Sequence, residues 1–253
     1  MTAREIARWL DRYLDSGRYD GADPSKNGLQ ADNAGGGVSR VAFAVDACLE
    51  AVQRASAAGA GMLVVHHGLF WRDAEPVVGA HYRRIKALLD ADMALYASHL
   101  PLDAHPVSGN NAGLAARLGL EGLEPFGEWH GATIGLRGSV PGGISLAEVL
   151  ARLDPDRTMS PRVLPFGPTR IASVAVVSGG GADELYQAIE RGVDCFVTGE
   201  IGHEEYHHAL ENGITVVAAG HYATETVGPR LVMAEFARDT GVDSIFIDVP
   251  TGL

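Results

Sequence analysis

Two similar series of alternating strand-like and helix-like segments occur along this chain, and they constrain its fold more than any other feature. In the first half, strands are predicted at 41–45, 62–65 and 93–97, with helices at 49–58 and 81–91. In the second half, strands are predicted at 171–177, 195–197 and 215–219, with helices at 183–191 and 204–212. Strands separated by helices favour α/β sheets that are parallel or mixed.

The two halves also match in the positions of individual polar residues. His99 corresponds to His221, and Asp103 corresponds to Glu225, at the same offset along the chain. The offset between the two halves is larger for the elements that come before this point, and an extra segment at 71–79 in the first half accounts for the difference. We therefore predict two similar α/β domains that arose by internal duplication.

The expected domain boundary lies between residues 123 and 124, which gives domains 1–123 and 124–253. The last helix (229–238) and strand (244–249) are able to pack back on the first half. The join at 125–168 is rich in glycine and proline, so we expect an irregular connection with one short helix at 146–153.

Composition excludes several classes of protein. The 253 residues carry a formal net charge of −12, which makes nucleic-acid binding unlikely because phosphate binding requires clustered positive charge. The two cysteines, Cys48 and Cys195, are too few for a disulfide framework and form no Cys-x-x-Cys pair. The N-terminal segment at 2–14 predicts an amphipathic helix whose acidic residues interrupt the apolar stretch of a secretory signal. Since apolar runs elsewhere have strand length, we expect a cytoplasmic protein without a membrane segment.

Histidines and carboxylates follow the ends of four predicted strands. Because open α/β sheets place their chemistry beyond the carboxyl ends of strands, these positions form the candidate site. They are His66 and His67 after 62–65, His99 and Asp103 after 93–97, Glu200 after 195–197, and His221 and Glu225 after 215–219.

Imidazole nitrogens and carboxylate oxygens are the usual ligands of zinc, manganese and iron. Five or more such donors suit two metals about 3.5–4 Å apart. Each residue also has a structural interpretation: a histidine is commonly hydrogen-bonded in a core, Asp103 could cap a turn, and Glu225 could be a solvated helical residue. The convergence of four clusters in two matching halves favours the metal site. The glycine turn at 178–181 is a candidate phosphate contact, with a plain tight turn as the alternative.

Several motifs resemble those of one protein family. They are KNGLQ at 26–30, VVHHGLFW at 64–71, HLPLDAHP at 99–106, GNNA at 109–112, SGGG at 178–181, TGE at 198–200 and GHYATE at 220–225. Together they resemble the NIF-three-like dinuclear metal-centre family, whose members are also labelled GTP cyclohydrolase 1 type 2 homologues. The likeness runs nearly from end to end of the chain.

The resemblance implies a metal site in the cleft between the two domains. At matching positions, the implied ligands of two divalent ions per chain are His66, His67, Asp103, His221 and Glu225. The donor set suits zinc, iron or manganese alike. The resemblance also implies a homo-oligomer, a toroidal hexamer.

The expected activity is a hydrolase of the GTP cyclohydrolase type, in which a metal-bound water attacks a small nucleotide or another phosphate-containing substrate. His99 is the candidate proton shuttle, with His105 as a weaker one, and Glu200 is expected to orient a ligand histidine. Phosphoester hydrolysis by the same metal pair is chemically as plausible. The alternative from another class is a non-catalytic metal-binding or scaffold protein.

Overall fold

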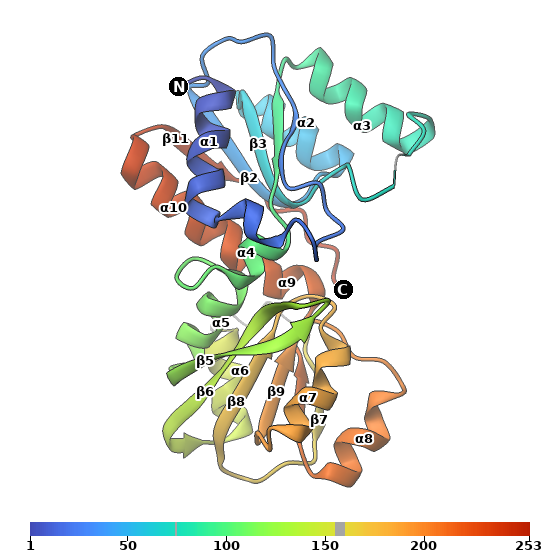
Figure 1. The fold of residues 1–253 in the computed structure, drawn as a ribbon, viewed down its shortest axis with the longest axis vertical. Coiled ribbons are helices and arrows are strands. Elements are labelled where there is room, and N and C mark those ends of the chain that lie inside the picture. Colours follow the sequence, from blue (N-terminus) through green and yellow to red (C-terminus); the bar gives the residue numbers. More distant parts are fainter. Residues whose placement is uncertain (74, 155–159) are drawn as a thin grey trace. The chain divides into compact units, whose positions relative to one another are not determined.

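The computed structural model describes residues 1–73, 75–154 and 160–253, which form two compact units (Figure 1). The first unit comprises residues 1–102 and 228–249, and the second comprises residues 103–227 and 250–253. The chain passes from one unit to the other inside α4 (Leu100–Ala104), near the start of α10 (Val227–Thr240), and after β11 (Asp243–Phe246). The leading segment of the first unit ends at Leu102, whereas the sequence placed the division between residues 123 and 124.

The first unit contains a five-stranded sheet in the order β1-β4-β3-β2-β11. Its strands are β1 (Gly28–Ala31), β2 (Arg40–Asp46), β3 (Met62–His67), β4 (Ala94–Ala97) and β11. β4, β3, β2 and β11 run parallel, and β1 lies antiparallel to β4 at the edge. The carboxyl ends of the parallel strands therefore meet at one edge of the sheet.

Helices cover both faces of this sheet. They are α1 (Ala3–Leu14), the short 3-10 helix η1 (Ser16–Tyr19), α2 (Leu49–Ala57), α3 (Gly79–Asp90) and α10. α1 and α10 cover one face, and α2 and α3 cover the other (Figure 1). Phe43 and Val64 belong to the apolar cluster with α1 and α10, and the next residues, Ala44 and Val65, belong to the cluster with α2 and α3. This two-residue alternation in continuous apolar runs is the signature of a sheet that is buried on both sides.

The second unit contains a six-stranded sheet in the order β5-β6-β8-β9-β10-β7. Its strands are β5 (Glu121–Trp129), β6 (Ala132–Ile144), β7 (Arg162–Pro165), β8 (Ile171–Val177), β9 (Cys195–Thr198) and β10 (Thr215–Ala218). β8, β9 and β10 run parallel, and the other three strands are antiparallel additions at the edges. The three consecutive parallel strands β2, β3 and β4 of the first unit thus correspond to β8, β9 and β10 of the second, as an internal duplication predicts.

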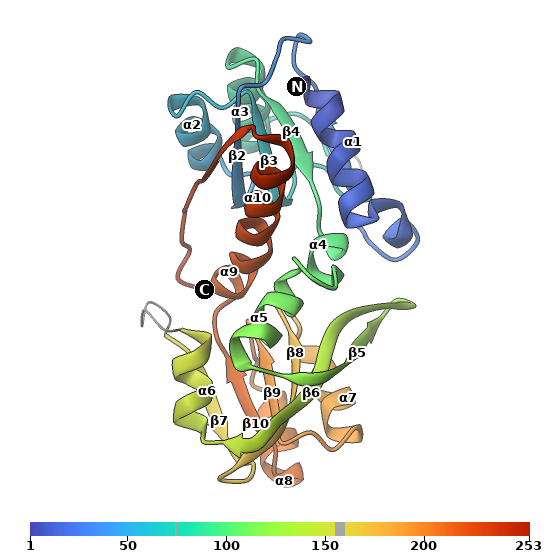
Figure 2. The ribbon, with the colours of Figure 1, turned by 90° about the vertical axis from the view of Figure 1, so that its left-hand side faces the viewer.

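The helices of the second unit pack in two groups. α5 (Asn110–Leu118) contacts α6 (Leu146–Leu153), and α7 (Leu185–Glu190) contacts α8 (Glu205–Asn212) (Figure 2). The 3-10 helix η2 (Ala182–Glu184) leads into α7, and α9 (His221–Glu225) follows β10. The prediction of an α/β protein with two similar domains and mixed sheets is confirmed. In the part of the chain that the structure describes, no helix has the length and apolar character needed to cross a membrane.

The short helix predicted at 146–153 is confirmed as α6. The prediction of an otherwise irregular join at 125–168 was wrong, because β5 and β6 form a long antiparallel hairpin there. Gly127 and Gly142 adopt positive φ. The pairing of β5 with β6 and that of β6 with β8 both contain register shifts. β5 lies at the sheet edge, and its first five residues are exposed. Bulges, glycines and an exposed edge remove the regular alternation from which a strand is predicted.

Candidate functional site

Three histidines gather at the carboxyl ends of β3 and β4 in the first unit. The ring centroids of His66 and His67 lie 4.5 Å apart, and the ring of His99 lies 5.1 Å from His66 and 5.7 Å from His67. One ring nitrogen of each can be chosen so that all three lie within 4.8 Å of one another, as a shared metal ion would require. Neighbouring strand residues ordinarily point to opposite faces, but at the end of β3 both imidazoles serve the same cluster.

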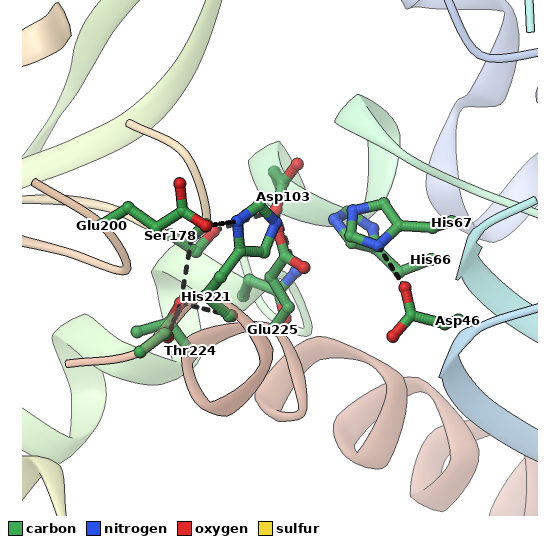
Figure 3. A network of polar contacts seen from close by, with 12 residues as sticks. Asp46, His66, His67, Asp103, Ser178, Glu200, His221, Thr224 and Glu225 are labelled. Atoms are coloured by element: carbon green, nitrogen blue, oxygen red, sulfur yellow. Dashed lines mark hydrogen bonds and ion pairs between the residues drawn. The ribbon is translucent and has the colours of Figure 1, made fainter. Parts of the chain in front are cut away.

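The Nδ1 atoms of these histidines are all occupied by oxygen atoms of the chain. His66 Nδ1 lies 3.0 Å from the backbone oxygen of Ser98, and His67 Nδ1 lies 2.9 Å from a carboxylate oxygen of Asp46 (Figure 3). Because a carbonyl or ionised carboxylate can only accept, Nδ1 is the donor in these contacts, and in the neutral imidazole Nε2 is then the nitrogen with the lone pair. This is the usual state of metal-binding histidines, whose second nitrogen donates to a carbonyl or carboxylate.

His99 is held by a buried carboxylate. Its Nδ1 donates to Asp23 at 2.8 Å, and its backbone N–H donates to Asn27. The side chain of Asp23 is fully buried and also accepts from Ser25 N–H and Leu100 N–H. Burial by itself raises the pKa of Asp23, but the hydrogen bond and charge of His99, with the other donors, outweigh it and lower that pKa below its usual value. Asp23 is therefore an ionised partner for His99.

The second unit holds the predicted acidic donors and His221. Asp103, on α4, is buried and accepts from Asn110 Nδ2 at 2.9 Å and from Ser178 Oγ at 3.0 Å. Glu225, at the end of α9, is buried, and one of its oxygens lies within 4.8 Å of an oxygen of Asp103. Two carboxylates this close and this buried repel each other unless a cation lies nearby or one is protonated.

His221, at the start of α9, lies between two carboxylates. Its Nε2 is 3.1 Å from Glu225 Oε1, one helical turn further on, and its Nδ1 is 2.7 Å from Glu200 Oε1 (Figure 3). The hydrogen bond with Glu225 is the largest influence that raises the pKa of His221, to about 9, against the opposing effect of burial. Glu200 adds a further hydrogen bond and further negative charge. In the metal-free chain His221 is therefore protonated at neutral pH.

The glycine turn between β8 and η2 packs directly against this pair. A Cβ atom on Gly179 would lie 2.1 Å from Glu225 Oε1 and 3.3 Å from His221 Nε2, and Gly179 has φ +63°. The N–H groups of Ser178 and Gly179 donate to Asn111 Oδ1 and to Thr224 Oγ1. Two N–H groups of the predicted phosphate-contact turn are therefore already used as donors within the protein. They tie the turn to Thr224 on α9 and to Asn111 on α5.

Each unit thus brings together its own share of the predicted site residues. His66, His67 and His99 form one cluster; in the other, Glu225 lies near both Asp103 and His221, and Glu200 is bonded to His221. His105 has another role, since its Nδ1 accepts from Ser108 N–H in the turn after α4. Sequence analysis missed Asp23 and Asp46. Asp46 directly follows the predicted strand at 41–45, so the strand-end rule could have found it, whereas nothing local marks Asp23.

Known proteins match this chain over nearly its full length. Residues 1–252 match the model of the family described as Duf34/NIF3 (NGG1p interacting factor 3). A protein of Treponema pallidum named "GTP cyclohydrolase 1 type 2 homolog" is 46% identical, with 100% of both chains covered. A protein of the same name from Halobacterium salinarum is 48% identical, with 98% of this chain and 100% of the relative covered. The crystal structure of TTHA1606 from Thermus thermophilus is 38% identical, with a TM-score of 0.92 and 100% of each chain covered.

Proposed function

Because this chain belongs to the Duf34/NIF3 family, we propose that it is a dinuclear metal-dependent hydrolase that acts on a nucleotide or a related phosphate-containing compound. The ligands that we propose are His66, His67, Asp103, His221 and Glu225. The observation that carries the proposal is the hydrogen bonding of the three proposed ligand histidines, His66, His67 and His221. The Nδ1 atom of each lies at hydrogen-bonding distance from an oxygen of the chain. Such second-nitrogen bonds orient imidazoles for metal binding.

The donors fit divalent cations in spacing and in chemistry. Two ligands at about 2.0–2.1 Å from a tetrahedral zinc ion stand about 3.3 Å apart, and His221 Nε2 lies 3.1 Å from Glu225 Oε1. A cation here would replace the proton that these two atoms now share. Nitrogen and oxygen donors without thiolate suit zinc, iron and manganese.

The chain's own residues then position groups and move protons. When bound, two divalent cations polarise substrate oxygens and lower the pKa of water. The Nδ1–H group of His99 donates to Asp23, and this leaves Nε2 as the atom that takes up and returns a proton. The hydrogen bond to the buried carboxylate of Asp23 holds the ring of His99 in orientation. Asp46 and Glu200 hold the rings of His67 and His221 in orientation.

Metal analysis and an activity assay on matched variants test this function. We expect purified, metal-loaded protein to contain about two ions per chain and to turn over GTP or a generic phosphoester. His66→Ala and Glu225→Gln, one from each unit, should lower both the metal content and the turnover. His203→Ala is the matched control, because His203 is exposed and takes no part in either cluster. If wild-type protein turns over neither substrate faster than His66→Ala does, the chain is a metal-binding protein without hydrolase activity.

The oligomeric state belongs to the same proposal. The resemblance implies a hexamer, so the native mass should be about six times the 26.6 kDa of one chain. Light scattering coupled to size exclusion measures it, and a monomeric mass at micromolar concentration would refute the hexamer without affecting the metal assignment.

A further inference from the structure

An indole ring lies beside the three histidines of the first unit. The ring of Trp71 is 5.2 Å from that of His99 in an edge-to-face arrangement, with an interplanar angle of 74°. It is 6.3 Å from the ring of His67. Trp71 is half-buried, so the residue as a whole keeps part of its surface exposed.

The apolar core does not account for this tryptophan. The two residues before it, Leu69 and Phe70, pack into the apolar cluster between the sheet and helices α2 and α3. The ring contacts described for Trp71 are instead with imidazoles. An indole in such a polar place offers a flat π surface to a ligand that approaches the histidines.

The backbone on either side of Trp71 is tied down. Trp71 forms an isolated β-bridge with Ser25, and Lys26 N–H donates to the Phe70 carbonyl at 3.0 Å. Gln30 Oε1 accepts from Leu69 N–H at 2.7 Å. A ring whose backbone is already fixed loses little conformational freedom when a ligand stacks on it, so stacking there contributes more to affinity.

We propose that Trp71 is the stacking surface for the base of the substrate, and that it makes the site select planar heteroaromatic rings such as a purine. This inference rests on the proposed function, since it assigns the base-binding part of the same site. Stacking on an aromatic side chain tolerates any base, because every base has a π face. Trp71 therefore selects nucleotides over sugar phosphates without reading which base is present.

Calorimetric titration of the metal-loaded full chain tests the inference with two matched probes, guanosine 5′-monophosphate and ribose 5-phosphate. Wild-type protein should bind the nucleotide about tenfold more tightly than the sugar phosphate. Trp71→Leu should abolish this preference by weakening nucleotide binding alone, whereas Trp71→Phe, which keeps an aromatic ring, should retain most of it. Trp129→Leu, in the second unit, is the control and should change neither affinity.

Three outcomes would overturn the inference. They are equal affinity of wild-type protein for both probes, unchanged nucleotide affinity in Trp71→Leu, and an equal loss for both probes in that variant. Failure of the proposed function would look different, because wild-type protein would then prefer the nucleotide but lack turnover or bound metal.

Discussion

The imidazole of His99 donates from Nδ1 to a fully buried oxygen of Asp23 at 2.8 Å. The same carboxylate accepts from the backbone N–H groups of Ser25 and Leu100, so one ionised side chain holds a loop, a helix start and a histidine. Buried charge of this kind is tolerated only when it is fully hydrogen-bonded, and its loss leaves several donors without an acceptor.

Asp23→Asn should reduce both the stability of the protein and the dependence of that stability on acidic pH. Folding lowers the pKa of Asp23, so its ionised form stabilises the folded chain above about pH 3.8, and this contribution is lost as the pH falls through the lower pKa of the folded state. We expect the variant to lose about 1–3 kcal/mol of unfolding free energy at pH 7. Urea unfolding between pH 3 and pH 7 measures the effect, with exposed Asp20→Asn as the control. A parallel pH dependence in wild-type and Asp23→Asn proteins would contradict the assignment.

Metal binding should release a proton from His221. Its pKa is raised to about 9, chiefly by Glu225, and a metal ligand must be neutral, so cations compete with this proton below pH 9. The apparent affinity should therefore rise about tenfold per pH unit between pH 7 and pH 9 from this group. Calorimetry in buffers of different ionisation enthalpy counts the released protons. Glu200→Gln removes one of the charges that raise the pKa of His221, so it should lower the count at pH 8. An identical count in that variant would exclude this role for Glu200.

Gly179→Ala should disrupt the His221–Glu225 pair, whereas Gly180→Ala should not. A Cβ at Gly179 meets Glu225 Oε1 at 2.1 Å in a left-handed backbone conformation, but a Cβ at Gly180 makes only an ordinary contact of 3.7 Å with His221 Cε1. We expect Gly179→Ala to lose metal and about 1–3 kcal/mol of stability. The test is to measure the metal content and the thermal unfolding of the two variants, purified side by side. Equal metal content and equal stability of the two variants would show that the turn adjusts to the added methyl group.

The two cysteines should differ in reactivity. Burial raises the pKa of the Cys195 thiol to about 12, and the side chain lies inside β9. Cys48 is half-buried at the start of α2, where its sulfur accepts from Ala51 N–H. An aromatic disulfide reagent should therefore modify one thiol in the native protein and two in denaturant, because only a thiolate within reach of the reagent reacts. Cys48→Ser should show no native reaction. Fast modification of that variant would mean that β9 opens readily.

Much of the architecture could be predicted from local patterns. Continuous apolar runs predicted β2, β3, β8, β9 and β10, and amphipathic runs predicted the helices between them. The carboxyl-end rule then selected His66, His67 and His221 with no knowledge of their neighbours. These inferences worked because strand and helix periodicity, and the end of a strand, are properties of a few consecutive residues.

Other features were beyond local patterns. The β5–β6 hairpin is not predictable from local alternation, because bulges and glycines at a sheet edge remove that alternation. The sequence allowed the last helix and strand to pack back on the first half, but it did not indicate that β11 would lie parallel to β2, about 200 residues earlier. Pairing between distant strands depends on which edge is left open once the rest of the sheet has formed, and no short window of sequence records that.

By itself the sequence determined which side chains are candidate metal ligands by their chemistry and at which strand ends they lie. Only the tertiary structure decided what each imidazole donates to: Asp23 is 76 residues from His99, Asp46 is 21 from His67, and Glu200 is 21 from His221. A hydrogen bond needs its two atoms within about 3 Å, and a folded chain reaches that distance through packing rather than through sequence spacing. Which oxygen of the chain each imidazole is bonded to is therefore a property of the fold.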